Sequence, residues 1–186
     1  RAVLDSLAKA VDTLLVAGAG VNARSLAAPQ GVAAMLGPAA QANPELVVRW
    51  AGMPLRAARA FKSPAELDLI RKAVQITTRA HADVMRLVEP DVNEFEAQAL
   101  IEFTFRRNGA DRPAFATIVG SGPNAVTLHY NRNDRFMQAG ETVVIDIGAS
   151  YRGYSADVTR TLPVSGTFTP EQRLIYQTVR DAQAAA

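Results

Sequence analysis

The chain contains no cysteine, which excludes disulfides, thiolate zinc sites and cysteine nucleophiles. It also lacks any run that approaches the roughly 18 consecutive apolar residues of a membrane-spanning helix, and no charged-then-apolar leader opens it. Neither positive nor negative charge is in large excess, since the net charge is +2. The basic residues are scattered along the chain. These features argue against nucleic-acid and membrane partners, and we expect a soluble, cytoplasmic protein.

The composition is ordinary for a globular protein, with 48% apolar and 20% charged residues. The length of 186 residues suffices for one good core, or for one domain plus part of another. Helical patterns run from Ser63 to about Val88, over 93–108 and onward from Thr169, and strand-like runs cover 115–119, 125–130, 142–147 and 155–161. The order helix, helix, strands, helix predicts an α+β fold with an antiparallel sheet.

Local signals divide the chain into three parts. A region over 1–55 carries strand-like runs at 13–16 and 45–50, and we expect a connector over 56–63 and a main unit over 64–186. The main unit opens with a strong helix start, in which Ser63 is the expected N-cap, Pro64 takes the first helical position and Glu66 closes a capping box. Asn93 and Glu96 repeat this signal at the second helix.

Two aspartates lie in strand-like runs on either side of a short turn. If that turn centres on Tyr151 and Arg152, Asp146 lies directly opposite Asp157 on one face of a β-hairpin. Directly opposed like charges destabilise a sheet, and a carboxylate inside the apolar run 142–147 is costly to desolvate. One divalent cation, or a pair of them, bound between the two carboxylates would remove both penalties. The pattern therefore favours a metal site.

Two exposed strand aspartates, or caps of the turn, are the alternative interpretation of this pair. Their shared face and apolar flanks favour the functional interpretation, since perturbed carboxylates cluster at such sites. Ligands that are all oxygen suit Mn²⁺, Mg²⁺ or Ca²⁺, whereas an added imidazole would favour Mn²⁺, Co²⁺ or Zn²⁺.

Two histidines are present, and they have different interpretations. His129 ends the strand-like run 125–130, so it is either a hydrogen-bonded structural group or a proton donor or oxyanion stabiliser. His81 lies on the apolar stripe of the first long helix, where a partly buried packing histidine is the expectation.

Several motifs in one order carry a resemblance to a known family. They are Phe61-Lys62-Ser63-Pro64, Thr117-Ile118-Val119-Gly120-Ser121-Gly122, Leu128-His129-Tyr130, Val144-Ile145-Asp146-Ile147-Gly148-Ala149 and Tyr154-Ser155-Ala156-Asp157-Val158-Thr159-Arg160-Thr161. Together they resemble the first part of the Xaa-Pro aminopeptidases (aminopeptidase P) of the pita-bread metallopeptidase family. The resemblance implies that 64–186 forms the first half of a pita-bread catalytic domain, and that 1–55 is the tail of an α/β N-terminal domain.

The resemblance also implies roles for individual residues. Asp146 is expected to bind one metal ion, and Asp157 to bridge the two ions of a dinuclear centre, usually manganese. His129 matches the family's histidine on the substrate side, which supports the scissile peptide and its tetrahedral intermediate. The implied reaction releases the N-terminal residue of a peptide whose second residue is proline, with the metal ions supplying the nucleophile and charge stabilisation. The family often forms homo-oligomers.

The sequence departs from the family at the end of the site. The family completes its metal centre with one histidine and two glutamates from the second half of the fold. After Asp157 this chain has no histidine, and its only glutamate is Glu171, at an expected helix start. We therefore expect a fragment of a longer enzyme, inactive alone.

Three alternatives stay open at this point. A prolidase, which cleaves Xaa-Pro dipeptides, shares the same aspartate motifs. The pita-bread fold also serves as a non-catalytic binding module that has lost its metals, although the presence of Asp146, Asp157 and His129 speaks against this. A natural half-length protein that acts only in association is the third.

Overall fold

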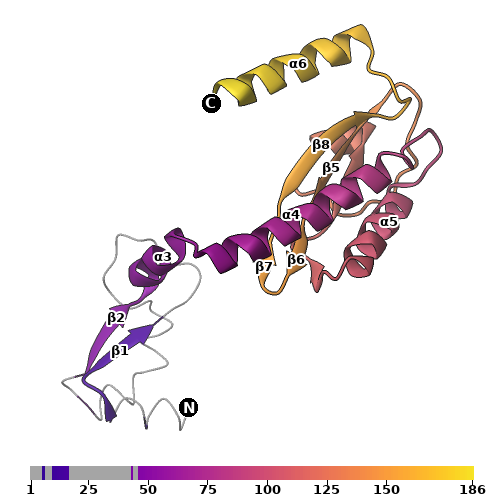
Figure 1. The fold of residues 1–186 in the computed structure, drawn as a ribbon. Helices are drawn as coiled ribbons and strands as arrows, with labels where there is room; N and C mark the ends of the chain where they lie inside the picture. The colour runs from indigo at the N-terminus through magenta and orange to yellow at the C-terminus, as the bar shows by residue number, and fades with distance from the viewer. Residues whose placement is uncertain (1–5, 7–9, 17–42, 44–45) are drawn as a thin grey trace. The chain divides into compact units, whose positions relative to one another are not determined.

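The computed structural model describes residues 6, 10–16, 43 and 46–186, which fall into two compact units, Arg1–Lys62 and Ser63–Ala186. In the first unit, β1 (Thr13–Val16) and β2 (Val47–Trp50) pair in parallel, and α3 (Gly52–Ala60) follows (Figure 1). Both strands were predicted, whereas α3 extends into the expected connector because its alanine, leucine and arginine residues favour a helix. Residues 1–5, 7–9, 17–42 and 44–45 of the predicted 1–55 region lie outside the described residues.

Three capped helices of the second unit begin where the sequence predicts. They are α4 (Pro64–Val84), α5 (Glu94–Arg107) and α6 (Pro170–Ala185). The Ser63 amide donates to Glu66 over 2.7 Å while the Ser63 hydroxyl accepts from the Glu66 amide, which confirms the capping box. A second capping box joins Asn93 and Glu96. Helix α4 ends at Val84, before the predicted Val88, in a turn that leads to Pro90.

Two small antiparallel sheets form the rest of the unit. The larger sheet has the order β4-β5-β8, with β4 at Ile118–Ser121, β5 at Thr142–Ile147 and β8 at Val158–Pro163. The smaller has the order β3-β6-β7, with β3 at Arg112–Pro113, β6 at Ala149–Tyr151 and β7 at Tyr154–Ser155. Because β5 continues through Gly148 into β6, and β7 continues through Ala156 and Asp157 into β8, the two sheets share one long hairpin.

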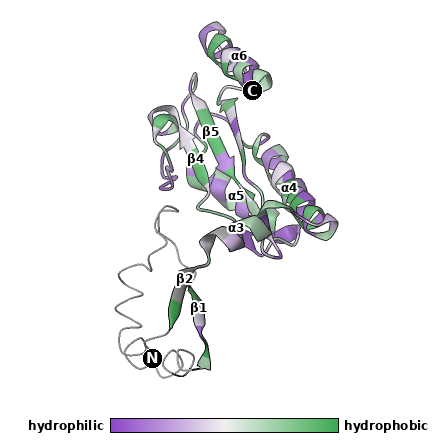
Figure 2. Ribbon diagram, turned by 90° about the vertical axis from the view of Figure 1, so that its left-hand side faces the viewer, coloured by the Kyte–Doolittle hydropathy of each residue, from purple (hydrophilic) through white to green (hydrophobic). Residues whose placement is uncertain are grey.

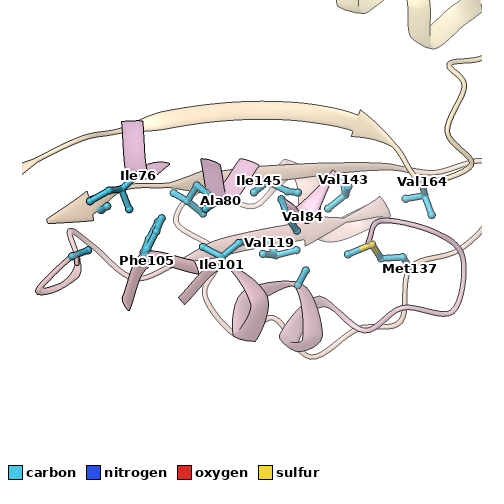
Figure 3. Packing of buried hydrophobic residues seen from close by; sticks show 14 residues of the cluster. Ile76, Ala80, Val84, Ile101, Phe105, Val119, Met137, Val143, Ile145 and Val164 are labelled. Atoms are coloured by element: carbon cyan, nitrogen blue, oxygen red, sulfur yellow. The ribbon is translucent and has the colours of Figure 1, made fainter. Parts of the chain in front are cut away.

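The core lies between the helices α4 and α5 and one face of the larger sheet. Alternation along β5 buries Val143, Ile145 and Ile147 and leaves Thr142, Val144 and Asp146 on the opposite face. Figure 3 shows the buried residues that meet in this layer: Ile76, Ala80 and Val84 from α4, Ile101 and Phe105 from α5, and Val119, Val143 and Ile145 from the sheet. Apolar colouring accordingly dominates β4 and β5 in Figure 2.

One predicted strand is absent. The segment 125–130 forms no strand, because a 3-10 helix over Gly122–Val126 leads into a turn at 127–129. Gly122 has a φ of 50°, and Pro123 lacks the amide hydrogen that a strand ladder needs. The strand predicted over 115–119 instead runs from Ile118 to Ser121. Among the described helices, none is long and apolar enough to cross a membrane.

Candidate metal site

The hairpin register differs by two residues from the predicted one. Asp146 is paired with Thr159, not with Asp157, and Tyr151 is paired with Tyr154. The turn therefore centres on Arg152 and Gly153, whose φ angles are 50° and 82°. Two positive φ angles are what a type I′ hairpin turn requires, and glycine suits the second position. The prediction of directly opposed aspartates was wrong because it centred the turn one residue too early.

The two aspartates nevertheless interact. Asp157 lies two residues before Thr159, the partner of Asp146, so the two side chains are diagonal neighbours. The pKa of Asp157 is raised above its ordinary value, first by partial desolvation and then by the charge of Asp146 and a hydrogen bond between the two carboxyls. Oδ1 of Asp146 is buried without a hydrogen-bond partner. A buried oxygen with no donor beside a second carboxyl fits a divalent cation.

The backbone around this pair is closely packed. A side-chain carbon at Gly148 would collide with the carbonyl oxygen of Ala156, so only glycine allows the two strands to approach here. On the helix side, the Thr77 hydroxyl accepts from the Ala149 amide over 2.9 Å, and Nε2 of His81 lies 2.9 Å from the Val158 carbonyl oxygen. Helix α4 thereby holds both strands next to the aspartates.

His81 is the packing histidine that the sequence predicts. Its side chain is 4% exposed, and burial lowers its pKa, which outweighs the opposing effect of the bond to Val158. A neutral ring then donates from Nε2 to the Val158 carbonyl oxygen.

The site is incomplete within the part of the chain that the structure describes. No group of three or more histidine, cysteine, aspartate or glutamate side chains that could hold a metal ion occurs among these residues. The structure brings Asp146 and Asp157 together. Within the described residues 46–186, His129 forms no hydrogen bond with either aspartate. His129 is exposed in the turn after the 3-10 helix, with a φ of 53°.

Sequence reasoning missed a buried carboxylate, Glu94. It is the first residue of α5 and 0% exposed, and it accepts hydrogen bonds from Ser121, Asn124, Tyr130 and the Arg135 amide. A glutamate in the first turn of a helix normally faces solvent, where it interacts favourably with the helix dipole. Nothing in its local sequence distinguishes this glutamate from such a residue.

Comparison with known proteins identifies the family. The sequence model described as metallopeptidase family M24 matches residues 68–186. The chain belongs to this family. Over 124 residues it is 44% identical to the Xaa-Pro aminopeptidase of Escherichia coli (strain K12), an alignment that covers 67% of this chain and 28% of that protein. The M24 chain thus spans less than a third of that relative's length.

Solved structures agree with the sequence comparison. Pseudomonas aeruginosa aminopeptidase PepP superimposes with a TM-score of 0.82 at 30% identity, covering 98% of this chain and 42% of that one. Prolidase from Pyrococcus furiosus gives a TM-score of 0.79 at 28% identity, covering 97% of this chain and 50% of that one. The resemblance to the aminopeptidase P family is confirmed, and the predicted α+β fold is part of the pita-bread architecture. Membership in a metallopeptidase family also implies divalent metal ions.

Proposed function

We propose that this chain is part of a Xaa-Pro aminopeptidase, a metal-dependent exopeptidase that releases the N-terminal residue from peptides with proline in the second position. The observation that carries the proposal is the interacting pair Asp146 and Asp157, with its unpartnered buried oxygen, in a chain of family M24. The substrate class comes from the similarity to the Xaa-Pro aminopeptidase of Escherichia coli.

Each named residue has a distinct task in this proposal. Asp146 and Asp157 hold the divalent ions, for which we propose a pair of Mn²⁺, because a hard or borderline cation suits carboxylate oxygens. Such ions, when bound, supply Lewis acidity and a nucleophile derived from water at neutral pH. His129 presents an imidazole from an exposed turn and hydrogen-bonds the peptide group of the substrate.

Metal titration of the chain tests the first part of the proposal. Asp157→Ala should abolish the weak Mn²⁺ binding expected of two carboxylates, as measured by isothermal titration calorimetry. Asp68→Ala is the matched control, because Asp68 is an exposed carboxylate paired with Arg71 at 2.8 Å on α4. If both variants bind Mn²⁺ like the wild type, the assignment of the metal site is wrong.

Activity of the full-length protein tests the second part. It should cleave a Xaa-Pro-Xaa tripeptide in the presence of Mn²⁺, and His129→Ala should reduce turnover while retaining the metal. Loss of metal in His129→Ala would show that this residue is a ligand instead.

Prolidase activity is the second candidate, favoured by the similarity to the Pyrococcus furiosus enzyme. Cleavage of a Xaa-Pro dipeptide alone, without cleavage of the tripeptide, would establish the prolidase and exclude the aminopeptidase. A full-length protein that binds Mn²⁺ but cleaves neither peptide would instead support a non-catalytic binding module.

A further inference from the structure

The turn that carries His129 is exposed, yet it lies between two anchored residues, Asn124 before it and Tyr130 after it. Leu128 is 92% exposed and His129 is also exposed, whereas the next residue, Tyr130, is 8% exposed. Asn133, three residues further on, is fully buried. The positive φ of 53° at His129 is uncommon for a residue other than glycine, so the surrounding structure must hold this backbone in place.

Glu94 holds the end next to His129. The Tyr130 hydroxyl donates to Oε2 of Glu94 over 2.7 Å, and the Asn124 side-chain amide donates to the Tyr130 hydroxyl over 2.9 Å. Burial, together with the bond to Glu94, raises the pKa of Tyr130 to about 12, so the hydroxyl stays a donor at neutral pH. The residue that follows His129 is therefore fixed in direction by a hydrogen bond as well as by packing.

The Glu94 carboxylate also accepts hydrogen bonds from segments on both sides of the turn. Oε1 of Glu94 accepts from the Ser121 amide and the Ser121 hydroxyl, each over 2.7 Å, at the end of β4. Oε2 also accepts from the Arg135 amide over 3.1 Å. The Arg135 guanidinium in turn donates to the Ser121 hydroxyl over 2.9 Å. One buried side chain thus joins the end of β4, the 3-10 helix, Tyr130 and Arg135.

Asn133 anchors the chain a second time, after Tyr130. Its Oδ1 accepts from the Val119 amide over 3.0 Å, and its Nδ2 donates to the Thr117 carbonyl oxygen over 2.9 Å and to Gln98 Oε1 over 2.7 Å. The side-chain amide thus takes the place of a paired strand along β4. Asn131 and Arg132, which are exposed and lie between Tyr130 and Asn133, are thus fixed at both ends, and the segment that follows the His129 turn stays on the sheet.

Stability alone does not account for a carboxylate at this place. Burying a charged group is costly, and apolar residues of similar volume often stabilise such a position as well or better. A carboxylate with five different donor groups instead specifies direction, since each donor must meet an oxygen at hydrogen-bond distance.

We propose that Glu94 is a positioning residue for His129, acting through the Tyr130 hydroxyl. This inference rests on the proposed function, in which His129 contacts the peptide substrate. Glu94 itself touches no substrate in this proposal, because it is completely buried. Glu94 therefore affects turnover only through the orientation of His129, the residue that precedes Tyr130.

A double-mutant cycle in the full-length, Mn²⁺-loaded enzyme tests this route. Tyr130→Phe removes one hydroxyl from a buried ring and should lower kcat for a Xaa-Pro-Xaa tripeptide by about 10- to 100-fold, the effect of a small misplacement. Its KM and Mn²⁺ affinity should stay near the wild-type values. In the His129→Ala background, Tyr130→Phe should cause no further loss, since the group that it positions is gone. Glu94→Gln should behave in the same way if it folds.

Tyr154→Phe is the matched control. Its hydroxyl also donates to a glutamate, Glu66, over 2.7 Å, but it lies outside the His129 turn, so kcat should not change. Equal losses from Tyr130→Phe in the two backgrounds, or no loss in either, would overturn the positioning role. Wild-type turnover in His129→Ala would overturn the proposed function instead.

A measurement on the chain itself gives a readout besides activity. ¹⁵N relaxation should show that the His129 amide becomes more mobile in Tyr130→Phe and stays rigid in Tyr154→Phe. A His129 amide that is equally rigid in both variants would refute the inference even if turnover had fallen.

Discussion

Replacing Asp157 by asparagine is expected to stabilise the metal-free chain and, at the same time, to abolish its response to Mn²⁺. The reason is the diagonal contact with Asp146, which places two carboxyls within hydrogen-bonding reach while Oδ1 of Asp146 has no donor. The variant removes one of the two like charges, and the new side-chain amide can donate to its neighbour.

The expected magnitude follows from the geometry. Charged pairs directly opposite on neighbouring strands are worth about 0.2–1 kcal/mol, and the diagonal placement together with solvent screening at the exposed Asp157 keeps the expected gain at ~0.5 kcal/mol. For a chain of this size, such a gain raises the melting temperature by about 1–2 °C. Mn²⁺ at ten times its dissociation constant adds about 1.4 kcal/mol to a protein that binds it, or about 3–6 °C.

Thermal unfolding followed by circular dichroism, with and without Mn²⁺, separates the two effects. Mn²⁺ should raise the melting temperature of the wild type and leave that of Asp157→Asn unchanged. Without the metal, Asp157→Asn should melt at a higher temperature than the wild type. Asp68→Asn, which removes an exposed carboxylate elsewhere, should match the wild type in both conditions. A lower melting temperature of metal-free Asp157→Asn would refute the reasoning, as would stabilisation of that variant by Mn²⁺.

Three other predictions concern the framework of the site. Gly148→Ala should lower both the melting temperature and Mn²⁺ binding, because the added carbon would displace Ala156; unchanged calorimetric binding would contradict this. The pKa of Glu141 is lowered, chiefly by its two hydrogen bonds with the Arg135 guanidinium. The ionised carboxylate therefore stabilises the folded state at any pH above the ordinary glutamate pKa. This contribution disappears as the pH falls through the lowered pKa. Glu141→Gln should therefore flatten the acid side of the stability–pH profile in urea titrations, and an unaltered profile would argue against it. Phe105→Ala should lower the free energy of unfolding by about 3–5 kcal/mol, since the ring is fully buried, and a loss below ~1 kcal/mol in urea would contradict the core assignment.

The helices of the main unit could be predicted because their signals are local. Ser63, Asn93 and Thr169 each cap a helix through a side chain and a partner three residues later, and the structure contains all three capping boxes. The strand at 142–147 was also predicted from its apolar, β-branched run, whereas the alternation that buries one of its faces became visible only in the structure.

The hairpin register and the segment 125–130 could not be predicted in the same way. The register depends on which two residues take positive φ angles, and Arg152 gives no such signal in the sequence. The run 125–130 has the composition of a strand, but no neighbouring strand is there to pair with it, because Asn133 occupies the edge of β4. Burial of Glu94 likewise depends on donors from residues 121–135.

The tight turn at Arg152 and Gly153 has a consequence for how the aspartates first meet. Asp146 and Asp157 are separated by a short stretch of chain, so bringing them together requires closure of only a small loop. Hairpins of this kind form within about 1–10 μs, well before most distant contacts of a large domain. We therefore expect the two carboxyls to become neighbours early in folding, and docking of α4 through Thr77 and His81 to hold the two strands in place. Pulse-labelling hydrogen exchange should show the amides of β5 and β8 protected among the first.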